Sequence, residues 1–155
     1  MKAEHINPFI QASQNVIQEI TGMSPILRKI YVKDSLYDDD HVIVLIGLTG
    51  ELEGNVIMSL KQPLACKITS IMLGGMPIVG IDEMAISAIS ELCNMILGNV
   101  ASIFAENNIN IDITPPSILN WETFLKLTPK WKLICIPLEL TDGEYVHIDI
   151  TYNSK

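Results

Sequence analysis

Glu91 and Asn94 are the two residues whose chemical types and spacing could serve a reaction. A carboxylate can pair with a cation, and a carboxamide can both donate a hydrogen bond to a water molecule and accept one from it. Residues three apart on a helix project side by side, so the two groups would form one polar site. The three histidines, His5, His41 and His147, are scattered and have no serine or cysteine at a spacing typical of nucleophilic catalysis.

A long helix over residues 82–107 is predicted to carry this pair. At 100° per residue, its apolar side chains fall on one broad face that we expect to be buried. That face comprises Ala85, Ile86, Ile89, Leu92, Cys93, Ile96, Leu97, Val100, Ile103 and Phe104. The opposite face comprises Ser87, Ala88, Glu91, Asn94, Met95, Gly98, Asn99, Ser102 and Ala105.

The second face differs from an ordinary solvated helix surface. Between residues 84 and 105 the only charged residue is Glu91, whereas exposed helices usually carry Glu and Lys four apart. Small residues such as Gly98 make the face flat, and Met84 and Met95 flank the polar pair as adaptable apolar contacts. The pattern leaves two interpretations open: the face packs against another helix of this chain or a second subunit, or it docks a partner protein.

The surrounding elements must position this helix. A first helix is predicted to have Asn7 as its N-cap and Pro8 in its first turn, and to end at Gly22. A turn at 49–51 would join two neighbouring strands into an antiparallel hairpin, while the stretch from 117 to 129 shows no clear pattern. The other expected elements are strands at 26–33, 41–48 and 52–60, a helix from 63 to 74, an extended segment at 109–113, and a hairpin of 131–140 with 145–152.

This order of elements predicts an α+β fold: one domain over residues 1–155, in which an antiparallel sheet carries two long helices and one shorter helix. Of the 155 residues, 48% are hydrophobic and 18% charged, which is typical of a compact globular domain. The 10 basic residues form no cluster against 18 acidic ones, and the net charge of -8 argues against nucleic acid and anionic membranes as partners.

Several patterns bear on location and metal binding. Residues 1–7 do not resemble the start of a signal peptide, and we expect a cytoplasmic protein without a membrane-inserted segment. Cys66, Cys93 and Cys135 lack any paired spacing, so free thiols are expected, with Cys93 in the core and no zinc site. The acidic run at 38–40 is interpreted as a solvated loop between two strands.

The segment that begins at Ser87 and includes Glu91 and Asn94 resembles the signature of the CheC, CheX and FliY chemotaxis phosphatases. That signature has Asp or Ser, three residues, Glu, two residues, Asn, and a proline downstream. Pro116 follows Asn94 after 21 residues, one fewer than the family spacing, which leaves the role of Pro116 open. Residues 1–16 and 112–116 are also similar to CheX proteins. Ala12 stands where a second Glu would be needed in the first helix, and a single pair per chain is the CheX arrangement.

The resemblance implies an activity and a role for each residue. The chain would hydrolyse the phosphoaspartate of a phosphorylated CheY-like receiver, with Asn94 orienting the attacking water and Glu91 pairing with the receiver's lysine to fix docking. Ser87, Met95 and Gly98 would contact the partner, and for Ser87 we favour the role of a small residue that permits close approach. No cofactor of its own is expected, because the receiver supplies Mg²⁺. A homodimer joined elsewhere, at sheet edges, is also implied.

Two alternatives stay open at this point. The chain could be a non-catalytic chemotaxis or flagellar-switch module of the same fold, which binds a phosphorylated regulator without hydrolysing it. It could also be a purely structural dimer that uses the flat helix face as its subunit interface.

Overall fold

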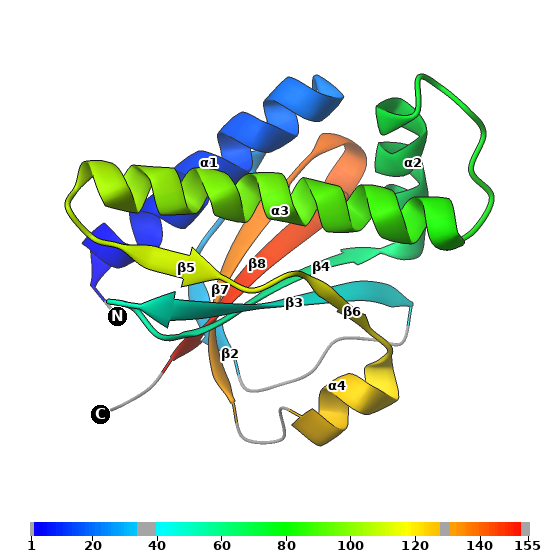
Figure 1. Cartoon of the computed structure of the whole chain (residues 1–155). Coiled ribbons are helices and arrows are strands. Elements are labelled where there is room, and N and C mark those ends of the chain that lie inside the picture. The colour runs from blue at the N-terminus through cyan, green and yellow to red at the C-terminus, as the bar shows by residue number, and fades with distance from the viewer. Residues whose placement is uncertain (1, 34–39, 128–130, 153–155) are drawn as a thin grey trace.

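A computed structural model of the chain describes residues 2–33, 40–127 and 131–152. Its helices are α1 (Ala3–Thr21), α2 (Gln62–Met72), α3 (Glu83–Glu106) and α4 (Trp121–Leu127). Its strands are β1 (Ile26–Leu27), β2 (Tyr31–Lys33), β3 (His41–Gly50), β4 (Gly54–Lys61), β5 (Ile111–Ile113), β6 (Ser117–Leu119), β7 (Lys132–Glu139) and β8 (Tyr145–Tyr152), with a 3₁₀ turn at Thr141–Gly143 (Figure 1).

All described strands belong to one antiparallel sheet. Its order is β1-β7-β8-β4-β3-β5, with β2 also paired to β7 and β6 also paired to β3. The two predicted hairpins are confirmed, because β3 pairs with β4 from His41 to Leu48 and β7 pairs with β8 over its full length. The turn predicted at 49–51 was wrong in position, because Thr49 and Gly50 continue β3 and pair with β5. The strand β3 lies inside the sheet, between β4 on one side and β5 and β6 on the other. It is apolar on both faces because Val44 and Ile46 pack in the core with residues of the helices, while Ile43 packs on the opposite side with Phe124 of α4.

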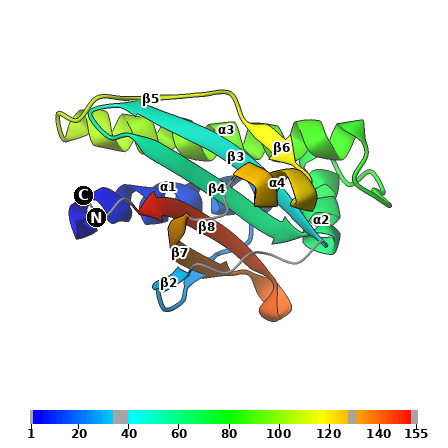
Figure 2. The same cartoon turned by 90° about the horizontal axis from the view of Figure 1, so that it is seen from below.

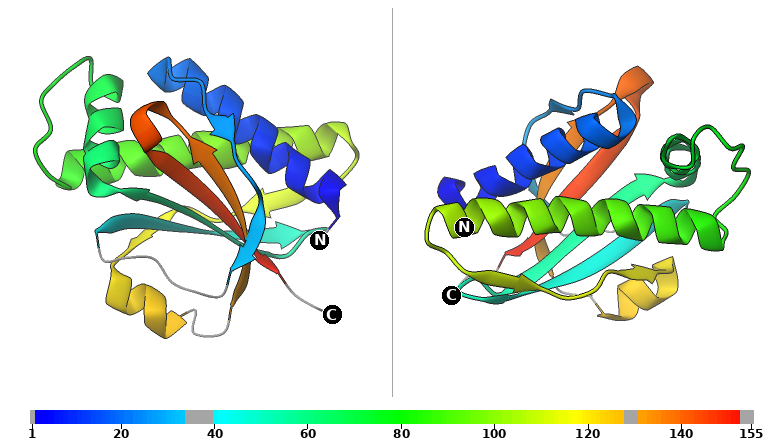
Figure 3. Two further views of the ribbon diagram at one scale, coloured as in Figure 1. Left: turned by 180° about the vertical axis from the view of Figure 1, so that it is seen from behind. Right: turned by 45° about the horizontal axis from the view of Figure 1, so that its top comes forward.

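Helices lie on both faces of this sheet. The helices α1, α2 and α3 cover one face, and the short helix α4 lies on the other, as the view from below shows (Figure 2). Further views show α1 and α3 packed together across the sheet (Figure 3). The predicted α+β class is therefore confirmed, and α4 is an addition within the stretch where the sequence showed no clear pattern.

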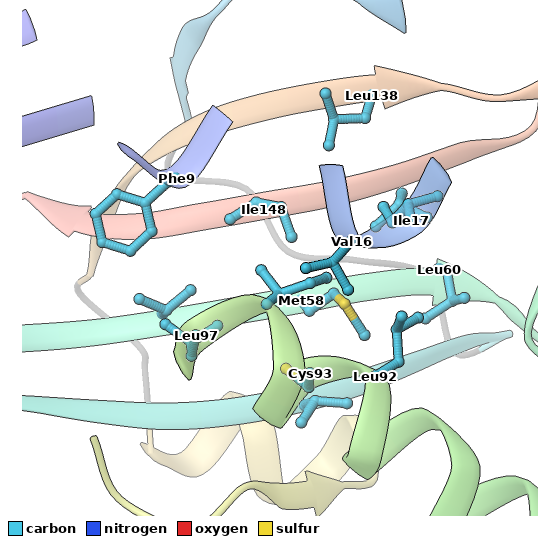
Figure 4. Close-up of a cluster of buried hydrophobic side chains, with 14 of the residues drawn as sticks. Phe9, Val16, Ile17, Met58, Leu60, Leu92, Cys93, Leu97, Leu138 and Ile148 are labelled. Atoms are coloured by element: carbon cyan, nitrogen blue, oxygen red, sulfur yellow. The ribbon is translucent and has the colours of Figure 1, made fainter. Parts of the chain in front are cut away.

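The larger hydrophobic core lies between the sheet and helices α1, α2 and α3. Side chains from the helices and from the sheet meet there, including Phe9 of α1, Met58 of β4 and Leu97 of α3 (Figure 4). Successive strand residues point to opposite faces, so the alternate positions Ile43 and Ile57 pack on the far side beneath α4, with Phe124 and Leu133.

Two predictions about the first part of the chain were wrong. The first helix begins at Ala3, so Asn7 is not its N-cap and Pro8 is a buried residue inside it. Ile6 packs against the core and the ring of His5 lies edge-on to Phe104, with centroids 6.3 Å apart. These contacts outweigh the hydrogen bond that a proline inside a helix removes. The single strand predicted at 26–33 is two short strands, β1 and β2, which both pair with β7.

Candidate functional site

The helix α3, which carries the candidate residues, is firmly seated in the fold. Its Asp82 N-cap accepts a hydrogen bond from the backbone N–H of Ala85 at 2.9 Å, and Glu83 favours the positive end of the helix dipole. Near its C-terminal end Phe104 packs edge-to-face on Phe9 of α1, with centroids 5.8 Å apart. The predicted bounds, 82–107, agree with the observed ones to within one residue at each end.

The division of α3 into a buried and an accessible face is confirmed with two exceptions. Ile86, which we expected in the core, is 40% exposed, and Ala88, which we expected on the accessible face, is only 8% exposed. Both differences have one cause. The end of α2 packs beside the first turns of α3, with Met72 and Leu73 near Ala88. The α2 helix therefore covers the side of α3 that carries Ala88, and Ile86 lies on the side that it leaves uncovered.

Glu91 and Asn94 lie on the accessible face without internal partners. Glu91 is exposed and Asn94 is half-buried, and they stand about 4.5 Å apart along the helix axis. Within the described residues neither side chain makes a hydrogen bond or an ion pair, unlike Glu139, which binds Arg28 at 2.7 Å. Their hydrogen-bonding capacity is therefore available to a molecule that docks on α3.

The other three candidate residues lie on the same stripe of α3. Ser87 is exposed one turn before Glu91. A Cβ atom added to Gly98 would meet no other atom within 4 Å, so packing inside this chain does not require glycine there. Met95 is half-buried and packs against the core, which leaves only part of its side chain for a partner. The structure brings all five residues together, and their roles stay predictions.

A hollow that the sequence did not reveal begins beside Glu91. It has a volume of about 490 Å³ and is lined by Met72, Leu73, Glu83, Met84, Ser87, Ala88 and Glu91. The sequence pointed to the lining residues of α3 that lie on or beside the accessible face: Met84, Ser87, Ala88 and Glu91. The residues from the end of α2 join it only through the packing of two helices, which periodicity within one helix cannot reveal.

Other candidate chemistry is weaker. Burial raises the pKa of the Cys93 thiol to about 12, so this cysteine stays protonated and belongs to the core, as predicted. All three cysteines are free. In the part of the chain that the structure describes, no three His, Cys, Asp or Glu residues lie close enough to hold a metal ion. Asp38 and Asp39 fall outside that part. Pro116 is half-buried and directly precedes β6.

A second polar pair is buried in the sheet, away from α3. Lys33 of β2 and Asp149 of β8 form an ion pair at 2.9 Å, with side chains 9% and 0% exposed. Burial raises the pKa of Asp149 to about 6, although the positive charge of Lys33 acts in the opposite direction. The next position on this face of β8, His147, is half-buried, and burial lowers its pKa to about 4. Its Nδ1 atom is buried without a hydrogen-bond partner among the described residues.

The helix α3 is also long and apolar enough to cross a membrane, judged by length and composition alone. Here its apolar face packs on the sheet and on α1, and nine of its residues are buried. A core helix of this kind has the same composition as a membrane span.

The comparison with known families decides among the expectations. Residues 42–139 match the family described as chemotaxis phosphatase CheX. The chain belongs to the CheX family. The expected family is thus confirmed, and with it the phosphatase class of enzyme, since a relative described as CheY-P phosphatase CheX, from Thermotoga maritima, is 29% identical over 99% of both chains.

Solved CheX structures show the same fold. The chemotaxis protein CheX from Vibrio vulnificus superposes with a TM-score of 0.80 at 24% identity, covering 97% of this chain and 100% of that one. The CheX–CheY–BeF₃–Mg²⁺ complex from Borrelia burgdorferi superposes with a TM-score of 0.78 at 23% identity, covering 97% and 98%. The arrangement of α1, α2 and α3 on one antiparallel sheet is therefore the family's.

Proposed function

We propose that this CheX-family chain hydrolyses the phosphoaspartate of a CheY-like response regulator with Glu91 and Asn94. The observation that carries the proposal is the position of this pair on the accessible face of α3, where neither side chain has a partner among the described residues. Neither side chain is used in a hydrogen bond or ion pair of the described fold, so both are available to a docked receiver.

The chemistry requires little of the protein. A phosphoaspartate is a mixed anhydride that is already activated toward water, and phosphoryl transfer proceeds through a loose transition state, so positioning contributes most of the catalysis. The Asn94 carboxamide would hold the attacking water in line with the scissile bond. The Glu91 carboxylate would pair with the receiver's active-site lysine and fix the register of docking. The divalent metal belongs to the substrate.

The same proposal covers location and assembly. A phosphatase that acts on CheY-like receivers works in the cytoplasm, which free thiols also favour. For a homodimer we favour the sheet edge at β2, where Tyr31 and Val32 are exposed, and Val32 is 61% exposed although it is apolar. An apolar edge strand is a surface on which a second strand can pair. Sedimentation of the wild-type chain and of Val32→Lys tests this, because a dimer at this edge would dissociate in the variant.

The decisive experiment follows the decay of phosphorylated single-domain receivers from the same cell, with and without catalytic amounts of this chain. At least one receiver should lose its phosphate much faster in the presence of the chain and should release one inorganic phosphate per acyl phosphate. A chain that binds phosphorylated receivers without accelerating their decay would be the non-catalytic module. If the α3 face were instead covered in a stable dimer, the chain would neither bind phosphorylated receivers nor accelerate their decay.

A further inference from the structure

The surface next to Glu91, toward the N-terminal end of α3, exposes large apolar side chains and is formed by a segment without basic residues. Large hydrophobic side chains are exposed along the end of α2, the following loop and the start of α3: Ile71 at 37%, Met76 at 47%, Val79 fully, and Met84 at 42%. Loops of soluble proteins rarely expose so many apolar groups together unless they contact something. In Figure 1 this loop projects beside the N-terminal end of α3.

The segment that forms this surface carries charges of one sign only. From residue 68 to residue 125 the sequence contains no Lys, Arg or His, while it contains six Asp or Glu residues. Two of them, Glu83 and Glu91, line the hollow, and within the described residues neither makes an ion pair. The last cation before the segment, Lys67, is held by Glu144 at 3.1 Å.

We propose that this hollow, lined by Met72, Leu73, Glu83, Met84, Ser87, Ala88 and Glu91, is a second contact for the receiver domain that determines which receivers are bound. The hollow shares Ser87 and Glu91 with the docking stripe, so a receiver seated on the Glu91–Asn94 pair also lies against it. Its chemistry selects a partner surface with an apolar side chain beside a Lys or Arg. The inference rests on the proposed function, because it places the receiver on α3.

Met84 and Ile86 provide a matched pair of variants. They are 42% and 40% exposed and only two residues apart, but they point about 160° away from one another around the helix. Met84 lines the hollow and Ile86 does not. Glutamine is a good helix former with nearly the size of methionine, so Met84→Gln and Ile86→Gln should both fold like the wild type.

The first measurement is affinity for Mg²⁺- and BeF₃⁻-loaded receivers, in which BeF₃⁻ stands in for the phosphoryl group. The second is the rate of phosphoreceiver decay against receiver concentration. Met84→Gln should weaken binding and raise the half-saturating concentration about fivefold, since it removes the burial of part of one apolar side chain, while the maximal rate stays constant. Ile86→Gln should match the wild type in both measurements.

A charge variant tests the second half of the proposal. Glu83→Gln should weaken binding severalfold at low ionic strength and much less at high ionic strength, because screening removes an exposed ion pair with the partner's cation. An equal loss at both salt concentrations would mean that Glu83 does not meet a cation.

The possible outcomes separate this inference from the proposed function. The hollow is not the contact if the wild type accelerates decay and Met84→Gln behaves like it in both measurements. The same conclusion follows if Met84→Gln and Ile86→Gln lose equal affinity for the loaded receiver. If receivers bind without faster decay and Met84→Gln alone weakens binding, the hollow stands and hydrolysis fails. If no loaded receiver binds the wild type, both proposals fall. If Met84→Gln instead dissociates a dimer in sedimentation, the hollow is an interface between copies of this chain.

Discussion

Two polar pairs in this molecule show how differently a carboxylate can be used. On α3, Glu91 and Asn94 are accessible and have no partner among the described residues. In the sheet, Asp149 is fully buried and its oxygen lies 2.9 Å from the Lys33 ammonium group. The accessible pair makes no hydrogen bond or ion pair that would stabilise the described fold. The buried pair ties β2 to β8 across β7, which separates them in the sheet.

The buried pair contributes its interaction free energy to folding, whereas the accessible pair can contribute its own to binding another molecule. A buried charge that loses its counterion costs several kcal/mol of stability, whereas an exposed group without partners costs almost nothing to remove. An unsatisfied group at an accessible position is instead ready to interact with another molecule.

The largest effect is expected for Lys33→Met, which leaves the Asp149 carboxylate buried without its cation. The free energy of unfolding should fall by about 3 kcal/mol at pH 8. Because burial already raises the pKa of Asp149 to about 6, the folded state binds this proton more tightly than the unfolded chain, and stability falls as the pH rises through that value. The loss in the variant should therefore be smaller at pH 5, where the carboxyl is protonated. Urea unfolding at both pH values measures it.

Lys67→Met is the matched control, since it breaks an ion pair of similar length, 3.1 Å, that is exposed to solvent. Its cost should stay within about 1 kcal/mol at either pH. Equal losses in the two lysine variants would remove the distinction between buried and exposed pairs in this fold.

Asn94→Ala should show the next largest effect, and in activity alone. Turnover should fall by about 10² or more while affinity for the receiver stays nearly constant, because the amide acts chiefly in the transition state. Single-turnover decay of a phosphorylated receiver against enzyme concentration separates the two quantities, and the melting temperature should match that of the wild type. Full turnover in this variant would contradict the catalytic assignment.

Glu91→Ala should fail differently. Its carboxylate is proposed to pair with the receiver's lysine, so affinity should drop about tenfold, and turnover should drop by a similar factor because docking loses its register. Binding by the variant should also depend less on ionic strength. A variant that loses turnover but binds normally at every salt concentration would show that Glu91 acts in the chemical step instead.

Gly98→Leu should have the smallest of these effects, about tenfold in affinity alone. A Cβ atom at this position meets no atom of the surrounding structure within 4 Å, and leucine improves helix propensity, so the variant should melt no earlier than the wild type. On the partner's side, however, leucine would hold a docked receiver away from α3. Gly98→Ala, which adds one methyl group, serves as the milder control. Unchanged binding by Gly98→Leu would contradict the flat-face interpretation.

The sequence predicted well those helices and hairpins that are determined by residues close together in the chain. The bounds of α3 and the two long hairpins follow from periodicity and turn residues, and the pair Glu91–Asn94 was recognised within one helix. The start of α1 was missed because packing of Ile6 and His5 overrides the signal of Asn7 and Pro8.

Contacts between segments far apart in the chain could not be predicted from the sequence. Lys33 and Asp149 are 116 positions apart, and no pattern in either strand announces their pairing. The hollow beside Glu91 likewise needs Met72 and Leu73, which the packing of α2 brings to α3. The same packing explains why Ala88 is buried and Ile86 exposed, contrary to the helical wheel.

The continuity of α3 has an evolutionary consequence. Glu91 and Asn94 occupy a single turn, the hollow lies on the N-terminal side of that turn, and Gly98 lies on the other. In the proposed roles, chemistry and recognition would follow one another along one helix of about 36 Å. Changes in the loop after α2 or beyond Asn94 would then retarget the enzyme and leave the turn that holds Glu91 and Asn94 unchanged. A duplicated gene could acquire a new substrate by such changes while keeping its rate.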